Sequence, residues 1–304
     1  MSDEIEAARA ALEAVPGIEG IGEIVRLGGL TNLVYRAETA GDPVCLRLAG
    51  KGTEEYIDRK VEAVNAQAAA RAGVSPEVLH LDAASGLMVT RFLEGVETMT
   101  PETFKSRPGA PGRAGQAFRQ LHQSGETFEF RFELFAMIDE YLKVLSTKEV
   151  DLPEGYHDVV AEAEAVRAAL DAHPAPLAPC HCDPPCENLL DTGGMWIVDW
   201  EYSGMNDPLW DLGDLSVEGS FDEAQDREMM EAYFEGEPSA AQWGRMVIYK
   251  AMCDLLWTLW GLIQHANKNP VDDFWAYSIG RFERCKALMA KPEFADHLRA
   301  VESG

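Results

Sequence analysis

The sequence predicts an α+β protein of two lobes, a small N-terminal lobe over residues 1–94 and a larger, mostly helical C-terminal lobe over residues 95–304. The chain has 304 residues, which exceeds the roughly 100–150 residues of a typical single domain. Before residue 95, short aliphatic segments alternate with Gly and Asp-Pro, whereas long helical patterns dominate afterwards. With 46% hydrophobic residues, the chain can bury a full core.

The N-terminal lobe should contain two helices and five strands. An amphipathic segment over residues 4–15 ends at Pro16-Gly17, and an alanine-rich helical segment over residues 53–71 is stopped by Gly73. Segments rich in β-branched and aliphatic residues, separated by turn residues, predict the five strands over 21–27, 33–38, 44–48, 78–81 and 87–92.

The C-terminal lobe follows a short connector at residues 91–95. Helical periodicity predicts helices over residues 116–122, 134–145, 157–172, 223–234, 240–265 and 272–289. One interruption, residues 179–199, is rich in proline and contains a short apolar strand at residues 196–198. The sequence shows no period of 20–50 residues, which excludes repeat architectures.

The charge balance excludes some classes of partner. The chain has 26 basic and 52 acidic residues, a formal net charge of −26. Binding of nucleic acid is excluded, because phosphate backbones must be neutralised by clustered Lys and Arg. An acidic body favours cationic small molecules or metal-masked phosphates as partners, although acidity also simply keeps a protein in solution.

The sequence also predicts a cytoplasmic protein with no membrane partner. Its N-terminus is acidic, where a signal peptide is basic and then apolar. The longest apolar stretch, residues 251–263, is interrupted by Asp254 and is shorter than the about 20 residues that span a bilayer. Six cysteines are too few for a secreted disulfide scaffold. Zinc is disfavoured at Cys180, Cys182 and Cys186, because no second pair with matching spacing follows, and a redox role for them stays open.

The proline-rich interruption contains a constellation typical of phosphoryl transfer. Asp183 and Asn188 are five residues apart in one loop, and Asp199 ends the short strand that follows. In such a site Asp183 takes the proton of the acceptor hydroxyl, while Asn188 and Asp199 hold Mg²⁺ against the donor phosphates. The alternative is a polar loop whose side chains cap their own turns. We interpret His181 and Asp211 as braces of this loop.

The other half of such a site should lie upstream. A glycine-containing turn joins the first two predicted strands, and in it the backbone of Gly29, the hydroxyl of Thr31 and the neighbouring Asn32 can approach phosphates. Arg47 ends a strand where protein kinases carry a lysine, and Glu62 in the following helix could pair with it. A hairpin turn and a surface ion pair are the simpler alternatives. The order of all four elements along the chain favours a nucleotide-dependent kinase.

These motifs resemble the choline/ethanolamine kinase branch of the aminoglycoside-phosphotransferase-like kinases over essentially the whole chain. The matching segments are residues 28–32, 46–62, 181–188, 198–212 and 256–264, with Tyr277 and Arg281-Phe282. The resemblance implies a bilobal protein-kinase-like fold with an antiparallel N-terminal sheet. It also implies ATP and Mg²⁺ as cofactors, and phosphorylation of a cationic amino alcohol, choline or a relative such as ethanolamine.

The resemblance further implies two binding regions. The connector at Arg91 and Phe92 would contact adenine through its backbone. The substrate site would be lined by aromatic residues with an acidic neighbour, namely Trp257, Trp260, Tyr277 and Glu218. The residues themselves support this, because the two tryptophans are three apart on one helical face and an aromatic ring attracts quaternary ammonium by about 0.5–2 kcal/mol. Two tryptophans in an apolar helix can equally be core residues.

Two other functions stay open. A kinase of the same fold acting on an aminoglycoside, a sugar or a homoserine-like hydroxyl would use several polar or acidic contacts instead of an aromatic cage. A pseudokinase would hold choline without turnover. The second alternative is disfavoured because the residues of a working kinase site are all present: Arg47, Glu62, Asp183, Asn188 and Asp199.

Overall fold

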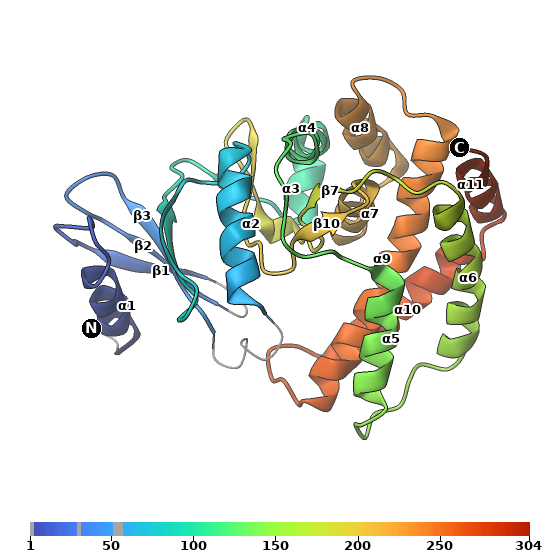
Figure 1. Cartoon of the computed structure of the whole chain (residues 1–304), viewed down its shortest axis with the longest axis horizontal. Helices are drawn as coiled ribbons and strands as arrows, with labels where there is room; N and C mark the ends of the chain where they lie inside the picture. The colour runs from blue at the N-terminus through green and yellow to red at the C-terminus, as the bar shows by residue number, and fades with distance from the viewer. Residues whose placement is uncertain (1–2, 29–31, 51–56) are drawn as a thin grey trace.

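In the computed structural model, described for residues 3–28, 32–50 and 57–304, a sheet-rich N-terminal part and a helical C-terminal part lie side by side (Figure 1). The N-terminus lies on the sheet part and the C-terminus at the opposite end of the molecule. The predicted α+β fold class, with an antiparallel sheet followed by a mostly helical part, is confirmed.

The N-terminal part is built on a five-stranded antiparallel sheet with the order β1-β2-β3-β5-β4. Its strands are β1 (Ile24–Gly28), β2 (Leu33–Ala37), β3 (Val44–Leu48), β4 (Val78–Asp82) and β5 (Leu87–Arg91). Helix α1 (Asp3–Glu13) packs against β1 and β3, where its Leu12 joins Tyr35 and Leu46 in a small separate core. All five predicted strands are therefore present.

Helix α2 (Arg59–Arg71) lies between the sheet and the helical part (Figure 1). It begins at Arg59 because the Asp58 carboxylate accepts the N–H groups of Lys60 (2.9 Å) and Val61 (3.3 Å), which caps the first turn. The predicted helix is therefore present from Arg59 onward, and residues 53–56 of that prediction lie outside the described residues. Alanines line the buried face of α2, and Glu62 is buried among them.

Two small sheets form around the predicted interruption, each with one strand from outside it. Strand β7 (Ala178–Cys180) pairs with β10 (Gly204–Asn206), and β8 (Leu189–Asp191) pairs with both β6 (Glu97–Thr98) and β9 (Met195–Ile197). The 3₁₀ turn η2 (Cys186–Asn188) leads directly into β8. Each of these strands has only two or three residues, too few for an alternating pattern to be visible in the sequence.

The helical part contains nine helices within the described residues: α3 (Pro101–Ser106), α4 (Ala110–His122), α5 (Leu134–Leu145), α6 (Tyr156–Ala172), α7 (Leu209–Glu218), α8 (Glu223–Phe234), α9 (Ala240–Ala266), α10 (Phe274–Met289) and α11 (Pro292–Ser303). Helices α3, α7 and α11 were not predicted, and α4 starts six residues earlier than predicted. Both α3 and α11 begin with proline, and α4 has proline in its first turn, where the missing N–H costs nothing.

Helix α9 is central, with α7, α10 and α11 packed against it. Its 27 residues are long and apolar enough to cross a membrane, but 83% of its most apolar window is buried inside the protein, as expected of a core helix. Gly261 lets α10 approach closely, because a Cβ there would lie 2.6 Å from Cδ1 of Tyr277. This contact brings Tyr277 against the face of α9 that carries the tryptophans.

Candidate active site

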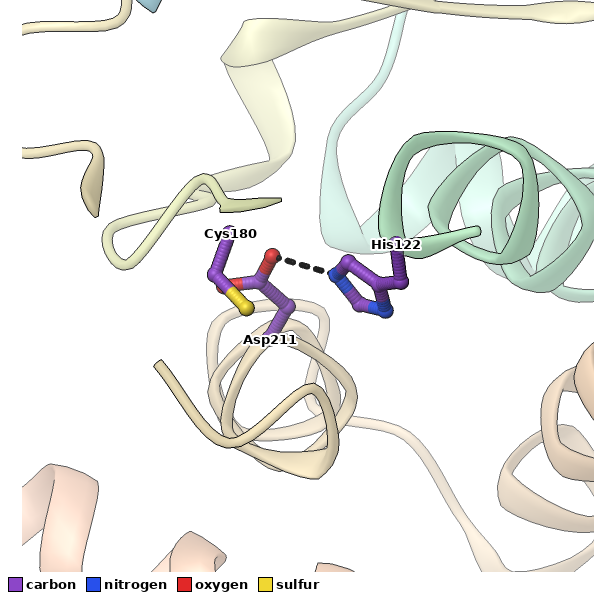
Figure 2. A group of neighbouring side chains, drawn as sticks. All are labelled: His122, Cys180 and Asp211. Atoms are coloured by element: carbon purple, nitrogen blue, oxygen red, sulfur yellow. Dashed lines mark hydrogen bonds and ion pairs between the residues drawn. The ribbon is translucent and has the colours of Figure 1, made fainter. Parts of the chain in front are cut away.

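The loop that carries Asp183 is held by the carboxylate of Asp211, in the first turn of α7. Its oxygens accept the backbone N–H groups of His181 (2.7 Å) and Cys182 (2.8 Å), and His122 of α4 lies 3.0 Å from the same carboxylate (Figure 2). Cys182 has a left-handed φ of 68°, which is unfavourable for a residue with a side chain and needs such support. These hydrogen bonds confirm the interpretation of Asp211 as a loop brace.

Figure 2 also shows Cys180 next to His122 and Asp211, and the possible ligand atoms of the three lie within 4.8 Å of one another. Burial raises the pKa of the Cys180 thiol well above its usual value, which disfavours the thiolate that zinc binds. The Asp211 oxygens are occupied by the loop, and the other ring nitrogen of His122 lies 3.0 Å from the Tyr233 hydroxyl. The group therefore joins α4, β7 and α7 structurally and is a poor metal centre.

Asp183, the predicted base, has suitable electrostatics for that role. Burial, followed by the negative charge of Glu218, raises its pKa to about 7 against the opposing effect of Arg281. Its side chain is nevertheless partly exposed and therefore reachable by a substrate. A base whose pKa lies near the working pH combines substantial ionisation with strong proton affinity. The catalytic role of Asp183 stays a prediction that these properties support.

The two predicted metal ligands are brought together by the β8–β9 hairpin. The N–H of Val198 donates to the carbonyl oxygen of Asn188 (2.9 Å), so that Asn188 lies beside the residue preceding Asp199. Nε2 of His181 lies 2.9 Å from the Val198 carbonyl oxygen. The loop that carries Asp183 is thus hydrogen-bonded to the end of the strand that precedes Asp199.

The surroundings of Asp199 suit a divalent cation. Its side chain is 34% exposed, and its Oδ1 has no hydrogen-bond partner among residues 3–28, 32–50 and 57–304. Burial, followed by the negative charge of Glu201, raises its pKa to about 8 against the opposing effect of Arg47. A carboxylate that lacks a donor and faces like charge gains from Mg²⁺, which prefers oxygen ligands. The residues present therefore fit the ion, with Asn188 as the other predicted ligand.

The predicted pairing of Arg47 with Glu62 is present. Two guanidinium nitrogens contact the two carboxylate oxygens, with Nη2 lying 3.0 Å from Oε2. Nη1 of Arg47 also lies 4.0 Å from Oδ1 of Asp199. Strand β3 therefore directs its cation toward the strand end where the metal ligand is predicted, the place at which a kinase neutralises donor phosphates.

Glu201 and Arg59 belong to this site and were not assigned by the sequence argument. Glu201 accepts a hydrogen bond from the side-chain amide of Asn32 (2.8 Å) and pairs with Arg59, which also pairs with Glu62 (2.8 Å). One carboxylate thus connects the turn after β1 with the start of α2. The available signal for Glu201 is its place in the Asp-Trp-Glu-Tyr segment, two residues after Asp199.

The other nucleotide-site predictions are only partly described. Gly29 and Thr31 lie outside the described residues. The guanidinium of Arg91 forms two exposed ion pairs, and Arg36 lies over the Phe92 ring at 5.1 Å. The backbone N–H groups of Arg91 and Phe92 both donate to carbonyl oxygens of the N-terminal part. Adenine contact at this connector stays a prediction, and it would use backbone groups other than these two.

Aromatic side chains from three segments form a cluster. The rings of Trp257 and Trp260 are 6.4 Å apart, Trp260 lies 5.9 Å from Tyr277, and Tyr202 packs edge-on against Trp257 at 5.8 Å. Trp257 is only 3% exposed, and its Nε1–H points to Asp214 (3.4 Å). Trp260 is partly exposed. Trp257 is therefore a core residue as well as a cluster member, and Tyr202 is a member that the sequence argument did not assign.

The acidic neighbour of this cluster, Glu218, is paired with Arg281 of α10. The Arg281 guanidinium also lies over the Tyr277 ring at 4.5 Å and pairs with Asp254 (3.2 Å). Asp254 in turn binds Arg284 through both of its oxygens. Both carboxylate oxygens of Asp254 are therefore already paired with arginines, although Asp254 shares the helix face of the tryptophans.

The chain is similar to known proteins in sequence and fold. Residues 23–246 match the phosphotransferase enzyme family. The crystal structure of a choline/ethanolamine kinase family protein from Mesorhizobium loti is 67% identical, with a TM-score of 0.91 and coverage of 99% of each chain. Protein LicA of Haemophilus influenzae is 26% identical over 275 residues, 86% of this chain and 78% of that protein. A structure of LicA in complex with AMP has the same fold, at 24% identity, a TM-score of 0.74 and coverage of 98% of this chain and 100% of the other.

Proposed function

This chain belongs to the phosphotransferase enzyme family, within its choline/ethanolamine kinase group, and on that premise we propose that it transfers the γ-phosphoryl group of ATP to the hydroxyl of choline. The observation that carries the proposal is the aromatic cluster next to the carboxylate of Glu218, whose charge also acts on Asp183. Rings and carboxylates together favour a substrate with a quaternary ammonium group.

The proposed reaction assigns a task to each group in the site. Asp183 accepts the proton of the substrate hydroxyl while that oxygen attacks the γ-phosphorus. Arg47, oriented by Glu62, provides a fixed positive charge on the nucleotide side. Asn188 and Asp199 would hold Mg²⁺, which neutralises charge on the donor phosphates when it is bound. Positioning and charge neutralisation suffice, because phosphoryl transfer needs no covalent enzyme intermediate.

The cluster favours choline over ethanolamine. A trimethylammonium group carries its charge under methyl groups, and aromatic rings can replace its water at little cost. A primary ammonium must replace lost water with hydrogen-bond acceptors. The accessible ring of Trp260 provides a face and no acceptor.

An ADP-release assay with several alcohols tests this proposal. Purified enzyme with Mg-ATP is given choline, ethanolamine, the N-methylated intermediates and kanamycin in separate reactions. We expect the highest kcat/KM with choline and a steady decrease as methyl groups are removed. Release of ADP with kanamycin alone would overturn the proposal in favour of an antibiotic kinase. Stabilisation by Mg-ATP without ADP release for any alcohol would indicate a pseudokinase.

A further inference from the structure

Arg281 is a cation of the protein itself inside the region proposed for a substrate cation. Its side chain is 7% exposed and reaches from α10 to Glu218 at the end of α7 and to Asp254 on α9. Its guanidinium lies 4.5 Å from the centre of the Tyr277 ring. Glu218 and Tyr277, two of the four groups predicted to receive the substrate, therefore already contact a positive charge.

Neutralisation of Asp254 does not require Arg281. The exposed Arg284 already binds both oxygens of Asp254, with Nε to Oδ2 at 3.0 Å and Nη2 to Oδ1 at 2.6 Å. Arg281 is the only described partner within ion-pair distance of Glu218. The contact that distinguishes the two arginines is therefore the one with Glu218.

The burial of Arg281 is also incompletely compensated. Its Nε has no hydrogen-bond partner in the part of the chain that the structure describes. A buried cation with an unsatisfied N–H is costly, and replacing such groups with apolar ones often stabilises a protein. Groups that lower stability in this way are expected where function requires them.

Resting on the proposed function, we propose that Arg281 is a specificity-determining, positioning residue that selects quaternary over primary ammonium substrates. By occupying Oε1 of Glu218 it leaves the carboxylate only partly available as a hydrogen-bond acceptor. A primary ammonium is penalised because it needs several acceptors, whereas a trimethylammonium group needs none. The negative charge of the surrounding carboxylates still attracts both cations.

The test compares Arg281→Gln with Arg284→Gln, a matched control that removes one guanidinium from the same Asp254 and touches neither Glu218 nor Tyr277. The measured quantity is kcat/KM for choline divided by kcat/KM for ethanolamine, at saturating Mg-ATP. In Arg281→Gln this ratio should fall by about ten- to a hundredfold. The fall corresponds to one charge-assisted hydrogen bond, which the ammonium group of ethanolamine can then form with Glu218. In Arg284→Gln the ratio should stay at the wild-type value. KM for ATP should not change in either variant.

Activity toward the uncharged choline analogue 3,3-dimethylbutan-1-ol separates a change in specificity from general damage to the site. A distorted site would lose activity toward this analogue and toward choline together. If Arg281→Gln does not fold, Arg281→Met replaces it, since methionine fills part of the same space without a charge and leaves the Glu218 carboxylate unpaired. Its ratio should fall in the same direction. An unchanged ratio in the folded Arg281 variant, or an equal change in Arg284→Gln, overturns this inference alone. A wild-type enzyme inactive toward every amino alcohol overturns the proposed function and this inference with it.

Discussion

Replacing each tryptophan of α9 with alanine should separate a core role from a substrate role. Trp257 is 3% exposed and packs against Tyr202 and Trp260, so Trp257→Ala removes a fully packed indole. Such truncations cost about 3–5 kcal/mol of unfolding free energy. For a 304-residue chain the entropy of unfolding near Tm is about 0.6 kcal/mol/K, which converts this loss into a decrease in Tm of about 5–8 °C.

Trp260 is partly exposed and should behave differently. Trp260→Ala loses less packing, so we expect a decrease in Tm of about 3 °C or less. Its choline KM should rise by about 2- to 30-fold, since the lost cation–π attraction is about 0.5–2 kcal/mol. The smaller effect on kcat follows because the ammonium group is remote from the reacting hydroxyl. Calorimetry and steady-state ADP release measure both quantities.

The reasoning is refuted by the opposite pattern. A Trp260→Ala enzyme with unchanged choline KM would mean that the cation binds away from this cluster. A Trp257→Ala enzyme that melts at the wild-type temperature would mean that the indole does not belong to the core. KM for ATP is the internal control, because the described contacts of the two tryptophans include neither Arg47 nor Asp199.

Three further predictions concern the catalytic groups. Asp183→Asn should keep nucleotide affinity while kcat falls by about 10²–10⁴-fold, and a variant with a tenth of wild-type turnover would exclude Asp183 as the base. The pKa of Asp183 is raised to about 7 and the base must be ionised, so kcat/KM for choline should fall as pH decreases through 7. A pH profile that is flat from about 5.5 to 8.5 would contradict this expectation. Asp199→Asn is the suitable variant for the metal site, because asparagine tolerates the left-handed φ of 68° at this position. It should abolish the Mg²⁺ dependence of ATP binding measured by calorimetry, and an unchanged Mg-ATP affinity would reject the metal assignment.

The sequence predicts the sheet and the long helices well because their signals are local. Each of β1 to β5 is an aliphatic run bounded by turn residues, and α9 is a long apolar helix pattern. The described part of α2 begins directly after Asp58, whose carboxylate caps the first turn, whereas the sequence argument continued the helix through this capping residue. Helix α7 was missed because its buried side chains surround it without a clear periodic stripe.

Within the site, the sequence predicts groups whose chemistry is recognisable from type and spacing. Asp183, Asn188 and Asp199 follow a known spacing, and the partner of Arg47 could be inferred from the helix after its strand. Glu201 and Arg281 could not be assigned in this way. Their contacts join residues far apart in sequence, as between Glu201 and Asn32, and depend on how helices pack rather than on a local pattern.

Two largely buried ion networks belong to the two sides of the proposed reaction. The first runs from Arg47 through Glu62 and Arg59 to Glu201 on the nucleotide side. The second consists of carboxylates and guanidiniums on α7, α9 and α10 and contacts the aromatic cluster through Arg281 and Tyr277; its members are Glu218, Arg281, Asp254 and Arg284. They share no ion pair within the described chain, so substitutions in one should affect the other nearly additively. Asp183 is where their fields meet, because both Glu218 and Glu201 raise its pKa. The proposed base is therefore the group through which we expect a change at the proposed alcohol side to reach the proposed nucleotide side.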